Sequence, residues 1–320
     1  MLAAMRRRRA PLRWPLAIAA LGLLSVAVVL ATRWSPVVAA HPAYPITLTL
    51  VAVACAAVAL GAVFTRTAGD GAPARRSRWR LAAGIVASIL AVALFGVLIW
   101  LRPLGATGRA IDALANGRGV DVSQSATRIA LRPTGRASGT GLVFYPGAKV
   151  DARAYAAILR PLAEAGHPVV IVKLPFGIAF ADADAAGDVI GDEDRVARWV
   201  VAGHSLGGTV AARYAGGGHR GVAGLLLWAS YPASSIRDRA GLAVTSVSAT
   251  EDGLATPADI AASRADLPPG TRFVAVEGAV HADFGDYGSQ SGDGTRTITH
   301  EEAQRRIVAA SLAMLERIGG

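Results

Sequence analysis

The fold is decided by the stretch Trp199-Val200-Val201-Ala202-Gly203-His204-Ser205-Leu206-Gly207-Gly208-Thr209. Its centre, Gly203 to Gly207, fits the pattern G-x-S-x-G, in which a serine stands on a sharp turn between a strand and a helix. The apolar residues 199–202 predict a buried strand, and residues 207–215 predict the helix. Flanking glycines avoid the clash that a Cβ would cause in so sharp a turn. We therefore predict that the turn presents the Ser205 hydroxyl at the top of a sheet.

Strands and helices alternate along the chain from about residue 127. The expected strands are 127–131, 141–145, 168–174, 199–202, 224–229, 242–249 and 272–277, and the expected helices are 152–165, 193–198, 207–215, 257–265 and 300–318. Continuous apolar strands separated by helices predict a mostly parallel α/β sheet that is covered on both faces. Ligands bind such sheets at the carboxyl ends of the strands.

Two later strand ends carry the residue types that would activate a serine. The strand at 242–249 is followed by Asp252, and the strand at 272–277 is followed by His281. A serine hydroxyl is a weak nucleophile unless a base removes its proton, and a carboxylate can orient that base. We therefore predict Ser205, His281 and Asp252 as nucleophile, base and acid.

Residues 128–320 resemble the α/β-hydrolase superfamily in its small, dienelactone-hydrolase-like branch. The resemblance is carried by the elbow at 203–207, by Tyr145-Pro146-Gly147-Ala148-Lys149-Val150 after a strand, and by the segment from His281 to Gly288. The order Ser, Asp, His is also that of the superfamily. Only residues 230–241 stand where larger relatives insert a lid, so we expect no cap domain.

The resemblance also implies an oxyanion hole made of two backbone N–H groups. One donor is expected at Leu206, directly after the nucleophile, and the other in the loop after the first central strand. Ala148 occupies that place. Many relatives have His-Gly where this chain has Pro146-Gly147, which is a departure from the pattern.

Several neighbouring residues could take other roles. Glu251 is the alternative to Asp252 as the acid, whereas His204 is expected to pack and Asp283 and Asp286 to bond within their loop. The Gly-, Ser- and Asp-rich segment 283–294 lacks the spacing of a calcium loop. We therefore expect no metal and no cofactor.

The first third of the chain predicts a membrane anchor. The stretches 16–32, 46–64 and 81–101 contain no charged residue or histidine, and each is about long enough to cross a ~30 Å hydrocarbon core. Ionisable residues would be expected in a transporter. We therefore predict an anchor at 1–102, a linker at 103–126 and a catalytic domain at 127–320. Glycines at 61, 84 and 96 are expected to let the helices pack closely.

Charge predicts the orientation of the anchor. The net charge is +10, but 14 basic and only three acidic residues precede residue 128. Arginines gather before the first stretch and between the second and third, which predicts a cytoplasmic N-terminus and an extracytoplasmic catalytic domain at the cell membrane. The remainder carries 19 basic and 20 acidic residues, so nucleic-acid binding is not expected. A signal peptide cleaved near Val38-Ala39-Ala40 is the alternative for the first stretch.

Together these patterns predict a membrane-anchored serine hydrolase that acts on carboxylic esters through an acyl-enzyme at Ser205. Its partners are then a small-molecule ester or acyl substrate and the lipid bilayer. An acyltransferase would use the same three residues. A non-catalytic binding domain on a hydrolase scaffold is the alternative from another class. The sequence leaves the acyl group, the leaving group and the oligomeric state undetermined.

Overall fold

The computed structural model describes residues 14–67 and 78–319, which form two compact units. One unit comprises the described parts of Met1–Trp34 and Pro45–Arg102. The other comprises Ser35–Tyr44 and Pro103–Gly320, again in its described part. The second unit therefore combines two segments that are far apart in the sequence.

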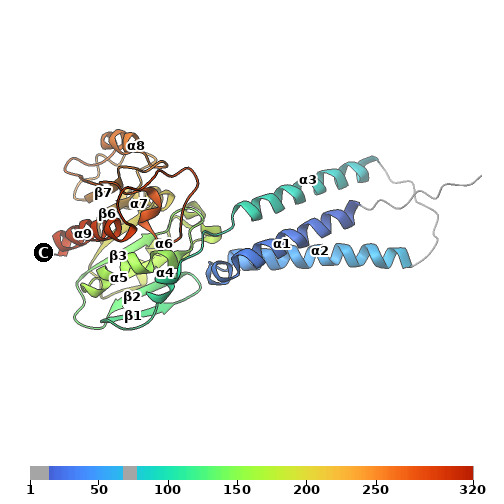
Figure 1. Cartoon of the computed structure of the whole chain (residues 1–320), viewed down its shortest axis with the longest axis horizontal. Helices are drawn as coiled ribbons and strands as arrows, with labels where there is room; N and C mark the ends of the chain where they lie inside the picture. The colour runs from blue at the N-terminus through green and yellow to red at the C-terminus, as the bar shows by residue number, and fades with distance from the viewer. Residues whose placement is uncertain (1–13, 68–77, 320) are drawn as a thin grey trace, which may run out of the picture. The chain divides into compact units, whose positions relative to one another are not determined.

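The first unit is built from three apolar helices, α1 (Trp14–Ala39), α2 (Ala43–Thr67) and α3 (Arg78–Trp100), labelled in Figure 1. All three are long and apolar enough to cross a membrane, as the three predicted stretches required. The arginines at 6–9, 13, 75 and 76, on which the predicted orientation mainly rests, lie outside the described residues. The orientation therefore stays a prediction.

The three helices approach one another closely at Gly22, which was not predicted from the sequence. A Cβ on Gly22 would lie 2.4 Å from the sulfur of Cys55 on α2 and 2.6 Å from the Phe95 ring on α3. Of the three glycines predicted to serve close packing, a Cβ on Gly84 would lie 3.1 Å from the Trp14 ring on α1. A Cβ on Gly61 or Gly96 would meet no heavy atom of another described residue within 4 Å, the nearby backbone of its own helix left out. A helical pattern alone does not tell which face of an all-apolar helix meets its neighbours.

The second unit is centred on an eight-stranded sheet with strand order β1-β2-β4-β3-β5-β6-β7-β8. The strands are β1 (Val120–Gln124), β2 (Arg128–Pro133), β3 (Thr140–Tyr145), β4 (Val169–Val172), β5 (Arg198–His204), β6 (Val222–Trp228), β7 (Ala243–Ala249) and β8 (Arg272–Val276). β2 runs antiparallel to β1 and β4, and all other neighbours are parallel. The predicted mostly parallel α/β sheet is confirmed.

The strand order reverses at the centre of the sheet. The chain passes from β3 outward to β4 and then returns to β5 on the other side of β3. Such a reversal leaves a crevice at the carboxyl ends of the two central strands, where ligands bind in open α/β sheets. The loops that begin after Tyr145 and His204 meet at this crevice.

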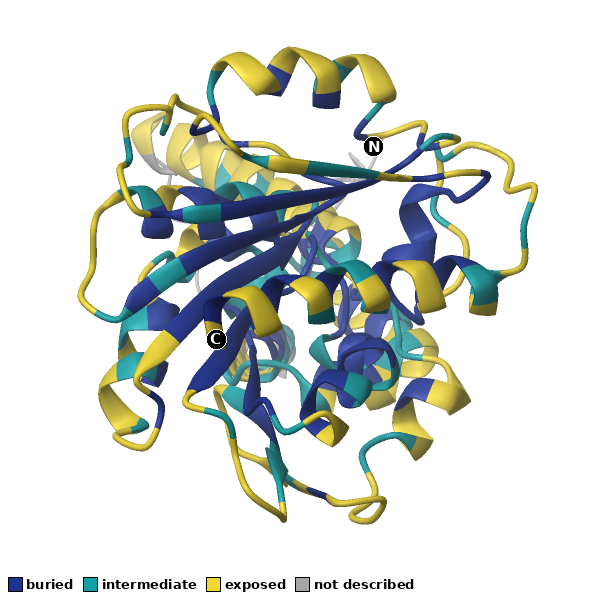
Figure 2. Cartoon of the chain, turned by 90° about the vertical axis from the view of Figure 1, so that its left-hand side faces the viewer, coloured by how far each residue is buried: buried dark blue, intermediate teal, exposed yellow. Residues whose placement is uncertain are grey.

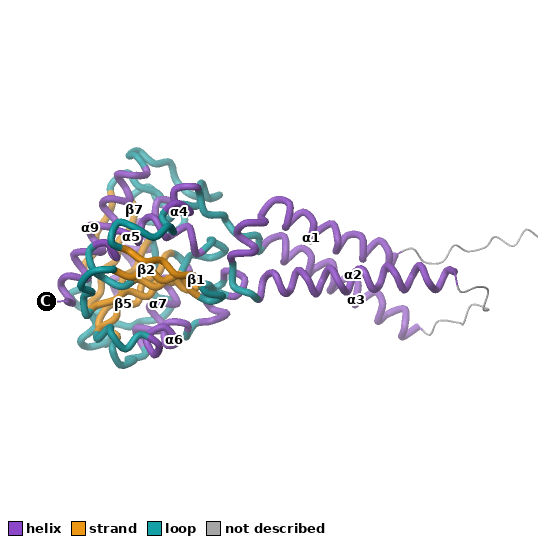
Figure 3. Tube along the Cα trace, turned by 90° about the horizontal axis from the view of Figure 1, so that it is seen from below, coloured by secondary structure: helices purple, strands orange, loops and turns teal. Residues whose placement is uncertain are grey.

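Helices cover both faces of the sheet. Alternate residues of β3 show the division, because Leu142 and Phe144 join one core cluster and Val143 and Tyr145 join the other. The helices are α4 (Gly108–Asp112), α5 (Ala156–Glu164), α6 (Ala185–Asp192), α7 (Leu206–Gly216), α8 (Pro257–Ala262) and α9 (His300–Gly319). α5 and α9 pack on the first cluster and α6 and α7 on the second, so the strands are buried between exposed outer helix faces (Figures 2 and 3).

Five short 3-10 helices complete the second unit. They are η1 (Ala152–Tyr155), η2 (Pro175–Gly177), η3 (Ala179–Asp182), η4 (Ser263–Ala265) and η5 (His281–Phe284). The helix expected at 193–198 is wrong. The helix of this region is α6, because its Ala185, Ala186 and Val189 provide an apolar face that becomes buried.

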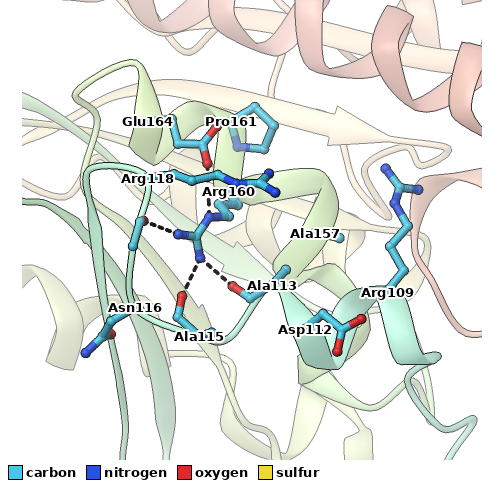
Figure 4. Close-up of a pocket in the computed structure, with 11 residues that line it drawn as sticks. Arg109, Asp112, Ala113, Ala115, Asn116, Arg118, Ala157, Arg160, Pro161 and Glu164 are labelled. Carbon is cyan, nitrogen blue, oxygen red and sulfur yellow. Dashed lines mark hydrogen bonds and ion pairs between the residues drawn. The ribbon is translucent and has the colours of Figure 1, made fainter.

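Residues 103–126, which we expected as a linker, contain α4 and β1 within the second unit. Arg160 on α5 fastens this segment (Figure 4). Its buried guanidinium donates to the Ala113 and Ala115 carbonyls at 2.7 and 2.8 Å, and also to the Gly117 carbonyl and the Glu164 carboxylate. The turn between α4 and β1 is therefore held by a side chain about 45 residues downstream.

Candidate active site

Ser205 stands on a strained turn between β5 and α7. Its φ of 52° lies in the left-handed region, where residues other than glycine are strained. The Ser205 N–H donates to the Trp228 carbonyl at 3.0 Å, and the Ser230 hydroxyl donates to the Ser205 carbonyl at 2.6 Å. The end of β6 therefore holds the turn in place.

The glycines around Ser205 are required by close backbone contacts, as the sequence pattern predicts. A Cβ on Gly203 would lie 2.4 Å from the carbonyl carbon of Gly207. A Cβ on Gly207 would lie 2.2 Å from the Tyr145 oxygen and 2.3 Å from the Pro146 oxygen. The start of α7 therefore packs directly on the loop that follows β3.

Asp252 and His281 meet above the carboxyl ends of β7 and β8. His281 Nδ1 lies 2.8 Å from Asp252 Oδ2, and both side chains are buried. The other oxygen, Asp252 Oδ1, accepts hydrogen bonds from the backbone N–H groups of Leu254 (2.7 Å) and Ala255 (2.8 Å). A carboxylate can only accept, so His281 donates from Nδ1, and in the neutral ring the lone pair is then on Nε2. In that tautomer Nε2 can accept a proton, as a general base must.

His281 Nε2 has no hydrogen-bond partner among the described residues. Ser205 and His281 are therefore not hydrogen-bonded to each other in this conformation, although the fold places both on loops at the same edge of the sheet. Hydrogen bonds between a nucleophile and its base often tighten only when substrate binds.

Asp293 braces the two loops that carry Asp252 and His281, a role that sequence reasoning missed. Its Oδ1 accepts from the N–H groups of His281 (3.0 Å) and Gly253 (3.4 Å). Its Oδ2 accepts from the Ala282 N–H at 2.8 Å. In the sequence Asp293 belongs to a segment rich in Gly, Ser and Asp, which has no signal that separates it from a solvated loop.

The other carboxylates considered for the role of Asp252 have different partners. Glu251 is exposed and accepts from the neighbouring Thr250 hydroxyl, so Asp252 is the carboxylate that contacts His281. Asp283 and Asp286 are buried and contact His300, with Asp283 Oδ1 2.8 Å from His300 Nδ1 and Asp286 Oδ1 3.1 Å from His300 Nε2. Hydrogen bonds to Asp283 and Asp286 raise the pKa of His300 to about 9.

Among the described residues, the N–H groups of Leu206 and Ala148 donate to no backbone carbonyl outside the regular helices and strands. By contrast, the Gly147 N–H donates to the Tyr155 hydroxyl at 2.9 Å. Leu206 and Ala148 are the two residues predicted from the sequence as oxyanion donors, and that role stays a prediction.

The Tyr155 hydroxyl connects the loop after β3 to the elbow. It accepts from the Gly147 N–H and lies within hydrogen-bond distance, 2.9 Å, of His204 Nδ1. The His204 ring is buried, with its centroid 4.5 Å from that of His281. Burial and the neighbouring His281 hold the pKa of His204 well below its usual range. His204 therefore packs as a neutral ring beside His281.

The part of the chain that the structure describes contains no group of three or more His, Cys, Asp or Glu residues arranged to hold a metal ion. The buried carboxylates Asp283 and Asp286 contact His300, Arg296 and Arg109.

This sheet topology, with an elbow serine after β5 and a paired acid and histidine after β7 and β8, defines a class of α/β proteins. The model of the alpha/beta hydrolase family matches residues 141–305, which is just over half of the chain. The chain belongs to the alpha/beta hydrolase family.

Solved structures of low sequence identity also match. A predicted CIB-like hydrolase from Thermoplasma acidophilum is 17% identical, with 61% of this chain and 100% of that one covered and a TM-score of 0.46. A thermostable esterase from Pseudomonas putida is 15% identical, with 65% and 87% covered and a TM-score of 0.45. An alpha-beta serine hydrolase homologue from Coxiella burnetii is 16% identical, with 61% and 98% covered and a TM-score of 0.43. No curated protein matches the sequence.

Proposed function

We propose that this chain is a membrane-anchored serine hydrolase that cleaves carboxylic esters through an acyl-enzyme on Ser205. The observation that carries the proposal is the 2.8 Å contact between His281 Nδ1 and Asp252 Oδ2, which leaves Nε2 of the same ring as an unused base. Membership of the alpha/beta hydrolase family and the strained Ser205 backbone support the same conclusion.

Each step of the proposed reaction is carried out by one of the three residues Ser205, His281 and Asp252. Ser205 Oγ attacks the acyl carbon while its proton passes to His281 Nε2, and Asp252 stabilises the imidazolium that forms. The imidazolium then protonates the leaving alkoxide, which departs as the alcohol. A water molecule, activated by the same nitrogen, attacks the acyl-enzyme and releases the acid and free Ser205.

The negative charge that develops on the acyl oxygen is stabilised by the Leu206 and Ala148 N–H groups. Removing one such donor costs roughly 3–4 kcal/mol of transition-state stabilisation in enzymes of this kind. Tyr155 contributes indirectly, because its hydrogen bond to Gly147 fixes the loop on which Ala148 stands.

Labelling with a fluorophosphonate tests the proposal, because this probe reacts with activated serines. We expect the full chain to be labelled and Ser205→Ala to lose both labelling and ester hydrolysis. Ser234→Ala is a matched control, because Ser234 is exposed on a loop away from the elbow. A folded wild-type chain that neither reacts with the probe nor hydrolyses any short-chain ester would overturn the proposal and favour a binding domain.

The alternative acyltransferase uses the same residues and differs only in the acceptor that attacks the acyl-enzyme. Adding increasing concentrations of an alcohol and measuring how the acyl group divides between acid and new ester separates the two. Hydrolysis that dominates at all alcohol concentrations supports the hydrolase.

A further inference from the structure

The hairpin Ser35–Tyr44 consists of the last residues of α1 after a kink at Arg33, the turn at residues 40–42 and the first two residues of α2. It belongs to the same compact unit as residues 103–320. Val37 and Tyr44 are each 1% exposed. The Arg153 guanidinium donates to the Ser35 hydroxyl at 3.1 Å, and the Tyr44 ring packs edge-on against the Phe176 ring at 6.0 Å. The hairpin is therefore packed as part of this unit and does not form a free loop.

The residues that the hairpin contacts include the loop with the Ala148 donor. A cavity of about 30 Å³ is lined on one side by Pro36, His41 and Tyr44 and on the other by Pro146, Lys149 and Phe176. The opposite side of the same loop touches the elbow, where a Cβ on Gly207 would meet the Pro146 oxygen at 2.3 Å. One loop, residues 146–150, therefore separates the hairpin from Ser205.

Two strained residues lie at this contact. Lys149 and Phe176 have φ values of 61° and 55°, in the left-handed region that favours glycine. The Lys149 N–H donates to the Gly177 carbonyl at 2.8 Å, which joins the two strained segments. Backbone strain of this kind persists where the surroundings impose it and gathers at functional sites. The hairpin is part of those surroundings.

The position of the hairpin between two apolar helices predicts that it lies at a bilayer surface. It joins two helices that are each long and apolar enough to cross a membrane. A short connection between two spanning helices lies at a bilayer surface. Val38 on the hairpin and Phe180 on η3 are 53% and 49% exposed. Phe180 follows shortly after Phe176, whose ring packs on Tyr44 of the hairpin. This surface therefore carries exposed apolar side chains where lipid would be met.

We propose that the hairpin Ser35–Tyr44 holds the ester-cleaving site at the bilayer surface, and that the substrate is an acyl ester embedded in the lipid. The proposal rests on the serine hydrolase function proposed above. A long acyl chain leaves a bilayer for water at a large cost for each buried methylene. A site at the surface lets the chain remain in lipid while the ester carbonyl reaches Ser205.

The test uses the full chain reconstituted in phosphatidylcholine vesicles and two esters with the same leaving group. Methylumbelliferyl acetate is presented in water and methylumbelliferyl oleate in the bilayer, and the ratio of oleate to acetate turnover is measured. We expect this ratio to be at least about ten for the wild type. Val38→Asp and Phe180→Asp should lower it roughly fivefold, because a carboxylate is disfavoured at the lipid interface.

Ile111→Asp is the matched control, since Ile111 is an exposed apolar residue on α4 that does not line the cavity beside the hairpin. Acetate turnover and fluorophosphonate labelling should stay unchanged in all three variants. A wild-type ratio near or below one, or variants that leave the ratio unchanged, would overturn the inference while acetate turnover and labelling upheld the hydrolase. A wild type that is not labelled and does not hydrolyse the acetate ester would overturn both this inference and the proposed hydrolase function.

Discussion

We expect His300 to make the stability of the second unit, the proposed catalytic unit, depend on pH. Its ring contacts the buried carboxylates Asp283 and Asp286, which also pair with Arg296 and Arg109. Asp283 in turn accepts from the Val280 N–H at 2.9 Å, directly before His281. Replacing His300 with glutamine keeps a hydrogen-bond donor and removes the positive charge.

The magnitude follows from the raised pKa of His300, about 9 in the folded chain against 6.5 for an unperturbed histidine. Such a shift corresponds to about 3 kcal/mol if fully expressed. The ring keeps 21% of its exposure, so solvent screening reduces the expected contribution to about 1–2 kcal/mol. Because the folded state favours the protonated ring, this contribution is complete below pH 6.5 and is lost as the pH rises through 9.

Thermal unfolding of the full chain in lipid nanodiscs measures this effect. At pH 6 we expect His300→Gln to unfold about 2–8 °C below the wild type, with the difference vanishing by about pH 10. His219→Gln is the control, because His219 stacks on Tyr214 and forms no ion pair among the described residues. A difference between wild type and His300→Gln that does not change with pH would refute the argument.

Two further predictions concern packing and buried hydrogen bonds. Gly207→Ala should destabilise the catalytic unit by about 3 kcal/mol, because its Cβ would overlap the Tyr145 carbonyl. Gly191→Ala, in α6 and open to solvent, should instead stabilise it by about 0.5–1 kcal/mol, and equal unfolding temperatures would contradict the prediction. Arg160→Met should cost about 3 kcal/mol, because three carbonyls lose their donor. Arg237→Met, at an exposed residue, should be nearly neutral in the same unfolding assay, and similar losses for both would show that the buried bonds contribute little.

The parts of the fold that follow from local sequence were predicted well. Continuous apolar runs place β3, β5 and β6 to within two residues, because each is buried on both faces and has no polar side to interrupt the pattern. The need for glycine at 203 and 207 was also predicted, since the turn itself demands it. Among neighbouring carboxylates, the choice of Asp252 over Glu251 agrees with the contact to His281.

The parts that depend on distant contacts were not predicted. β1 has only Val120 fully buried, so its pattern resembles that of an exposed linker. Asp293 acts on residues 11, 12 and 40 positions away, and the hydroxyl of Tyr155 meets a histidine 49 positions away. The composition of the sequence around each residue does not indicate such pairs. The membership of Ser35–Tyr44 in the catalytic unit is missed for the same reason.

That membership has a consequence for the biosynthesis of the chain. The ten residues of the hairpin leave the ribosome long before Pro103, with two apolar helices made in between. Their contacts with the catalytic unit are of high sequence separation, and such contacts form late because a long loop must first close. The catalytic unit can therefore reach its final packing only after α2 and α3 have been synthesised. A polypeptide that starts at Pro103 would lack a piece of its own unit, and solubility alone would not show that its site is intact.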